Sequence, residues 1–75
     1  MAEIRVPILD RTGAFAEVST LLAGIGVNIF DLEIAHSIEG DRGVLVMSVD
    51  EANLGVATKA LTERGFRTFT RRLGP

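Results

Sequence analysis

Segments with an apolar residue at every second position alternate along the chain with segments that repeat apolar residues every three or four positions. Residues 3–9 have the first pattern, with one apolar face made by Ile4, Val6 and Ile8. This alternation predicts a half-buried strand. Pro7 lies inside it and has no N–H to donate to a neighbouring strand, so we expect a local break in the strand there.

Residues 12–26 have the helical pattern. Their apolar side chains recur at the spacing of one helix face, at Phe15, Val18, Leu22 and Ile25, with Leu21 alongside. The preceding Asp10–Gly13 segment is typical of a turn, and Thr12 is the predicted N-cap because its hydroxyl can accept a hydrogen bond from the first turn. Gly24 and Gly26 end the helix, and Gly26 suits the left-handed conformation at a helix C-terminus.

The alternating pattern returns at residues 28–38 and predicts a second, longer strand. Its two faces carry Phe30, Leu32, Ile34 and Ile38 on one side and Asp31, Glu33 and Ser37 on the other. The polar run at 39–43 predicts a hairpin, and the continuous apolar stretch at 44–49 is typical of a central strand antiparallel to the second. If Leu45, Met47 and Val49 point at the helices, Val44 and Val46 lie on the opposite face of the sheet.

Asp50 is a predicted N-cap for a second helix that ends at Gly65. Its shared face consists of Leu54, Ala57 and Leu61, with Ala60 beside it. Residues 66–73 are rich in β-branched and aromatic side chains and predict a fourth strand. The order βαββαβ, with right-handed crossovers, predicts a ferredoxin-like α+β sandwich in which two helices cover one face of a four-stranded antiparallel sheet.

The chain length of 75 residues predicts a single domain over residues 1–75. A core this small supplies only about 3–5 kcal/mol, and the sequence contains no cysteine for disulfides. Self-association is therefore the expected additional source of stability, and the uncovered sheet face at Val44 and Val46 supports a homodimer. The absence of cysteine also agrees with a reducing, cytoplasmic location.

The charge balance argues against several partners. The net charge is −2 with acids and bases mixed, so no nucleic-acid or membrane-binding patch is visible, and Arg71 and Arg72 together are typical of a solvated strand end. No apolar stretch approaches the roughly 20 residues that cross a bilayer, and the N-terminus does not resemble a secretion signal. We expect a soluble, intracellular protein.

Catalytic chemistry has little support. A heavy-metal carrier would need a cysteine pair, and an RNA-recognition domain would need stacking aromatics where this chain has four phenylalanines and neither tyrosine nor tryptophan. His36 falls on the apolar face of the second strand and favours a core or interface role, while Asp31 and Glu33 lack the apolar setting of an acid–base pair. Arg11 and Asn28 loosely match an acylphosphatase pair, although a glycine-rich phosphate loop is absent. We expect no catalytic residue, metal ion or cofactor.

The joint between the first strand and the first helix has the chemistry of an anion site. The segment Asp10-Arg11-Thr12-Gly13 places backbone N–H groups at the positive end of a helix dipole, and Gly13 lets a ligand approach the backbone. The same residues also suit a plain turn and helix cap, and spacing alone favours that simpler role.

Two motifs resemble the ACT domain family, the small βαββαβ modules attached to enzymes of amino-acid metabolism. Residues 10–15, Asp-Arg-Thr-Gly-Ala-Phe, are similar to the family's Asp-Arg-Pro-Gly and apolar helix start, with Thr12 in place of proline. Residues 26–29, Gly-Val-Asn-Ile, resemble its Gly-x-Asn-Ile. With Gly65 and Phe66 the resemblance covers the whole chain, and it is strongest to the C-terminal ACT module of bacterial prephenate dehydrogenases, although no catalytic domain is attached.

The resemblance implies a mechanism. Two copies would pair through the second strand into one eight-stranded sheet with amino acids bound at the interface. Backbone groups of Arg11, Thr12, Gly13 and Ala14, next to Asp10, would receive the ligand carboxylate, while the Asn28 side chain and the Val27 and Ile29 backbone of the partner would hold its amino group. The resemblance favours an aromatic amino acid and a regulated enzyme on a separate or missing domain. A dimerisation module without a ligand, and more weakly the hydrolase, stay as alternatives.

Overall fold

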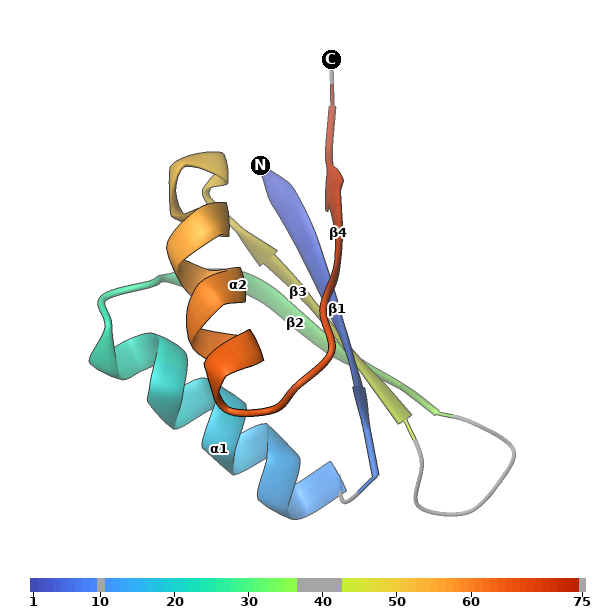
Figure 1. The fold of residues 1–75 in the computed structure, drawn as a ribbon. Helices are drawn as coiled ribbons and strands as arrows, with labels where there is room; N and C mark the ends of the chain where they lie inside the picture. The colour runs from blue at the N-terminus through green and yellow to red at the C-terminus, as the bar shows by residue number, and fades with distance from the viewer. Residues whose placement is uncertain (10, 37–42, 75) are drawn as a thin grey trace.

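The predicted element order is confirmed. The computed structural model describes residues 1–9, 11–36 and 43–74, which form β1 (Ala2–Ile8), α1 (Arg11–Gly24), β2 (Ile29–His36), β3 (Gly43–Val49), a 3-10 turn η1 (Glu51–Asn53), α2 (Leu54–Glu63) and β4 (Phe69–Arg72). The strands make one antiparallel sheet in the order β2-β3-β1-β4. Both helices pack side by side on one face of this sheet, as Figure 1 shows.

The core lies between the sheet and the two helices. Every second residue of the two central strands is buried there, and the cluster consists of Ile4, Val6, Ile8, Leu45, Met47 and Val49 from the sheet, Val18 and Leu22 from α1, Ala57 and Leu61 from α2, and Val27. Leu32 and Ile34 of β2 pack against this cluster. The period-2 pattern therefore assigned the faces of β1 and of Leu32 and Ile34 in β2 correctly, and Val44 and Val46 are half-buried on the open face as expected.

Helix α1 differs from its prediction at both margins. It begins at Arg11, so Thr12 is inside the first turn and is not the N-cap, and Asp10 lies outside the described residues. Phe15 and Ile25 were expected in the core but are 37% and 40% exposed. A helix that packs beside a second helix buries only a narrow stripe, here centred on Val18 and Leu22, and side chains at the margins of that stripe stay partly in solvent.

The C-terminus of α1 is closed as expected. Gly26 has φ +80°, the left-handed conformation that only glycine adopts at low cost. The Gly26 N–H donates to the Ala23 carbonyl (3.1 Å) and the Val27 N–H donates to the Leu22 carbonyl (2.9 Å), which is the Schellman arrangement. This cap turns the chain sharply from the helix layer into β2.

The expected break at Pro7 does not occur. β1 continues through it, with Pro7 opposite Val44 in an unbroken register with β3. On its other side β1 pairs with β4 only from Ala2 to Arg5. At Pro7 that side of β1 is therefore an edge, where a missing N–H leaves no ladder bond unmade.

A bulge shapes the start of β2. Ile29 pairs with Val49 and Asp31 pairs with Ser48, so Phe30 is an extra residue without a counterpart on β3. Phe30 is 55% exposed although its alternation with Leu32 predicts a buried position. The structure describes β2 as far as His36, and the remainder of the predicted strand with Ile38, like the predicted hairpin, lies outside the described residues.

The second half of the chain has two shifted boundaries. The Asp50 carboxylate accepts a hydrogen bond from the Ala52 N–H (3.1 Å) and so caps η1, while α2 begins only at Leu54. The predicted stop at Gly65 is correct, with φ +90°. β4 is shorter than the predicted 66–73, because Phe66 packs against the core and the chain reaches the sheet only at Phe69.

Candidate functional site

The first predicted half of the ligand site is the joint between β1 and α1. β1 ends at Ile8 and α1 begins at Arg11, so the positive end of the α1 dipole faces this joint. Thr12 and Gly13 are exposed and Ala14 is half-buried. Exposed backbone at a helix N-terminus favours an anionic ligand group such as a carboxylate.

The second predicted half lies at the start of β2. Val27 is buried and its backbone is held by the helix cap described above, while Ile29 is half-buried as the first residue of the strand. Asn28 lies between these two anchored residues and is exposed. Asn28 is thus exposed to solvent, while the backbone on both sides of it is held by the helix cap and by the first residue of β2.

Within one chain these two halves do not meet. They lie at opposite ends of α1, as Figure 1 shows, and a helix of 14 residues is about 21 Å long. Arg11 and Asn28, the loose acylphosphatase pair, likewise belong to segments at opposite ends of α1. The predicted amino-acid site needs groups from two copies.

The sheet register places the halves relative to the β2 edge. Ile8 and His36 both pair with Gly43, so α1 begins at the end of the sheet where β2 ends. Ala2 and Ile29 both pair with Val49 at the opposite end. β2 has β3 as its neighbour on one side and no strand of the described residues on the other. The two half-sites therefore lie at the two ends of one open sheet edge.

A charged cluster on the open face of the sheet was not expected. Glu3 is buried and accepts hydrogen bonds from Arg5 Nε (2.7 Å) and Arg71 Nη2 (3.3 Å). The hydrogen bond from Arg5, followed by the charges of both arginines, holds the pKa of Glu3 below its usual value of 4.5 against the opposing effect of desolvation. Arg71 is an exposed residue at the end of β4, as predicted, and through this pair it also joins β4 to β1.

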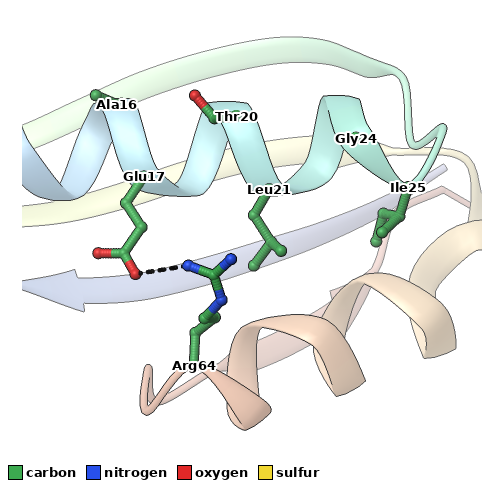
Figure 2. Close-up of a pocket in the computed structure, with 7 residues that line it drawn as sticks. All are labelled: Ala16, Glu17, Thr20, Leu21, Gly24, Ile25 and Arg64. Atoms are coloured by element: carbon green, nitrogen blue, oxygen red, sulfur yellow. Dashed lines mark hydrogen bonds and ion pairs between the residues drawn. The ribbon is translucent and has the colours of Figure 1, made fainter.

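An open depression lies elsewhere, between the two helices. It measures about 480 Å³ and is lined by Ala16, Glu17, Thr20, Leu21, Gly24, Ile25 and Arg64. Figure 2 shows that Arg64 reaches from the end of α2 towards α1, where its Nη1 pairs with Glu17 Oε2 at 3.3 Å. Because these charges neutralise each other and the remaining lining is mostly aliphatic, the groove lacks the convergent polar groups of a ligand site. Neither motif from the sequence lies in it.

The remaining predicted chemistry stays outside this site. Asp31 and Glu33 are exposed, opposite Ser48 and Val46 on the open face. Among the residues that the structure describes, no group of three or more histidine, cysteine, aspartate or glutamate side chains could hold a metal ion. None of the described helices has the length and apolarity needed to span a bilayer.

Known structures share this architecture. The ACT domain of prephenate dehydrogenase from Bacillus anthracis is 35% identical, with a TM-score of 0.84 over 89% of this chain and 99% of that one. A protein from Bacteroides thetaiotaomicron is 26% identical (TM-score 0.79) over 93% of this chain and 46% of its own. The regulatory subunit of aspartate kinase from Thermus thermophilus, 24% identical with a TM-score of 0.77 over 95% of this chain and 50% of its own, shares the fold. No protein-family model and no curated protein matches the chain.

The class of protein follows first from the fold, which is a ferredoxin-like βαββαβ sandwich with one of the two predicted motifs at each end of the β2 edge. The identity with the Bacillus anthracis domain, at full coverage of that domain, is specific enough to go further. This chain belongs to the ACT domain family, as its two motifs predicted.

Proposed function

We propose that the chain is a regulatory module that binds a free amino acid, with an aromatic one favoured, at two equivalent sites in a homodimer paired through β2. The module performs no chemistry itself and controls an enzyme of amino-acid metabolism, located on another chain or on a further domain. Family membership and the likeness to the prephenate dehydrogenase domain support this proposal.

The observation that carries the proposal is the sheet register. In an antiparallel pairing of two β2 strands about a two-fold axis, the start of one strand lies beside the end of the other. The start of β2 adjoins Asn28, and its end shares a row with Ile8, two residues before the described start of α1. Pairing would therefore bring the partner's Asn28 to the end of the sheet at which α1 of this chain begins, on a strand about three strand spacings, or 14 Å, from β1.

The residue types at this joint site suit a free amino acid. The backbone of Arg11–Ala14, reinforced by the α1 dipole, would receive the carboxylate. The partner's Asn28 side-chain oxygen, together with the Val27 and Ile29 backbone of that partner, would accept from the ammonium group. A zwitterion would thus meet a donor set from one copy and an acceptor set from the other.

Such a site can transmit a signal only through a difference in affinity. A ligand that touches both copies binds the paired form more tightly than the separate chains or a differently arranged pair. Its binding then shifts the population towards that pair by the ratio of the two affinities. An attached or associated enzyme would respond to this shift.

The proposal is tested by a thermal melt of the chain against each common amino acid at fixed protein concentration. Ligand at about 100 times its dissociation constant adds about 2.7 kcal/mol of stability, and each kcal/mol moves the midpoint of a small domain by about 4–8 °C. We expect a clear shift with one or two amino acids that Asn28→Ala abolishes. No shift with any amino acid would instead favour a dimerisation module without a ligand, and a shift that survives Asn28→Ala would place the site elsewhere.

A further inference from the structure

Two phenylalanine rings lie in solvent next to the two half-sites. Phe15 follows the Arg11–Ala14 segment directly and is 37% exposed, and Phe30 follows Ile29 directly and is 55% exposed. The chain has four phenylalanines in all, of which Phe66 packs against the core and Phe69 belongs to β4 at the far edge of the sheet. Single exposed apolar residues are ordinary on protein surfaces, but here one ring adjoins each half of the proposed site.

Phe15 lies on the flank of α1 that is nearer to the β2 edge. Glu17 faces α2, because it pairs with Arg64 (Figure 2). Phe15 precedes Glu17 by two residues, which places it about 160° round the helix axis from Glu17 and thus away from α2. Since α2 contacts β1 and β2 is the edge beyond β3, the side of α1 away from α2 is the side of β2.

Phe30 is the extra residue of the bulge and directly follows Ile29, which packs against the core on the helix-facing side of β2. The bulge interrupts the alternation here, and we infer that Phe30 shares the side of Ile29. A two-fold axis perpendicular to the paired sheet keeps the helices of both copies on that one side. The pairing that joins the half-sites therefore also carries the partner's Phe30 into the helix layer beside Phe15.

We propose that Phe15 and the partner's Phe30 form two walls of the joint site and select an amino acid with a large, flat apolar side chain. This inference rests on the proposed function and names the side chains that would determine which amino acid binds. Within one chain most of α1 lies between the two rings, so the proposed pair forms only across the dimer. An aromatic side chain gains both apolar burial and ring–ring contacts there, whereas a small or charged side chain gains neither.

The first test is a calorimetric titration of the chain with L-phenylalanine, L-leucine, L-alanine and L-aspartate. We expect L-phenylalanine to bind at least tenfold more tightly than L-alanine, with L-leucine between them and L-aspartate weakest. Tightest binding of L-alanine or L-aspartate would overturn the proposed walls while leaving the amino-acid site in place.

The second test removes the rings one at a time. Phe15→Ala and Phe30→Ala should each weaken L-phenylalanine binding about tenfold and leave L-alanine binding nearly unchanged. Phe69→Ala is the matched control, because Phe69 is 56% exposed but lies on β4 at the other edge of the sheet. Phe15→Leu and Phe30→Leu keep the apolar bulk and serve as controls for variants that fail to fold. Unchanged selectivity in both alanine variants would refute the assignment.

Mixing the two alanine variants tests whether the walls come from different copies. A heterodimer of Phe15→Ala with Phe30→Ala contains one site with both rings and one with neither. After random exchange about a quarter of all sites should regain tight L-phenylalanine binding. Absence of any recovery would show that the rings do not act in trans. Asn28→Ala separates the two levels, since loss of all amino-acid binding there with no effect of the ring variants supports the site and rejects its walls.

Discussion

The two edges of the sheet differ in ways that assign them different roles. β2 has eight residues, and its helix-facing side carries half-buried Leu32 and Ile34 next to an open ladder edge. β4 has four residues, all exposed, and its two arginines are held by ion pairs, Arg71 to Glu3 on the open face and Arg72 to Glu51 on the other. Both strands are edges, yet only β2 offers length and apolar surface to a second strand.

This contrast shows how one sheet can protect one edge and leave the other available. Short length and charged side chains are the usual means of blunting an exposed strand against pairing. In β4 the charges also tie the strand to β1 and η1, so they serve the fold of the single chain. β2 is longer and has no charged side chain among Leu32 and Ile34 on its helix-facing side. This difference between the two edges favours pairing between copies through β2.

The largest effect should come from a charge placed on the β2 edge. Leu32→Asp would put an unpaired carboxylate into a paired interface, and we expect the self-association constant to fall at least about hundredfold. Thr70→Asp is the control, because Thr70 pairs with Ile4 and so occupies the same helix-facing side on β4. Analytical ultracentrifugation measures both variants. A folded Leu32→Asp protein that still dimerises like the parent would disprove pairing through β2.

The glycines that lead into the two edge strands offer a second comparison. Gly26 precedes β2 and Gly65 precedes β4, both with positive φ, so replacement by alanine should cost about 1–2 kcal/mol in either case. Only Gly26→Ala should also weaken amino-acid binding, because Asn28 is two residues away. Chemical unfolding and ligand titration of both variants check this. Equal binding by the two variants would mean that the α1 cap does not position the second half-site.

The stabilising contribution of the ion pair between Glu3 and Arg71, which joins β4 to β1, should depend on pH. The pKa of Glu3 is lowered in the folded chain, chiefly by its hydrogen bond from Arg5, so the unfolded chain takes up the proton first as pH falls. The contribution of Glu3 is therefore fully present above the usual value of 4.5 and is lost as pH drops through the lower, folded pKa. Glu3→Gln should flatten the stability profile in that acidic range. An unchanged profile would remove Glu3 as its source.

The smallest effect is expected at the exposed ion pair of β4 with η1. Arg72 and Glu51 approach to 2.7 Å, but their side chains are 79% and 47% exposed. Such pairs contribute only about 0.2–1 kcal/mol and weaken in salt. Arg72→Ala should therefore lower stability slightly at low salt, as thermal melts can show, with no change in self-association. A loss of dimer would mean that β4 takes part in the interface.

Local pattern was sufficient for most of the fold. Alternation at residues 3–9 predicted the buried face of β1, the continuous apolar stretch at residues 44–49 predicted a central strand, and the two helix stops at Gly26 and Gly65 were predicted from the need for a left-handed residue. Features that depend on a neighbouring strand were missed. The continuity of β1 at Pro7 depends on where β4 begins, and the exposure of Phe30 depends on a bulge against β3.

The sequence by itself determined the element order, the buried faces and the two motifs, because helix and strand periodicity and glycine conformation act over a few residues. Tertiary structure alone decided that Glu3 joins β1 to β4 through Arg71 and that the β2 edge has no neighbouring strand among the described residues. These facts depend on strand order and register, which bring residues far apart in the chain into contact. The proposed site, with groups from two copies, depends on that arrangement, which periodicity within a few residues does not specify.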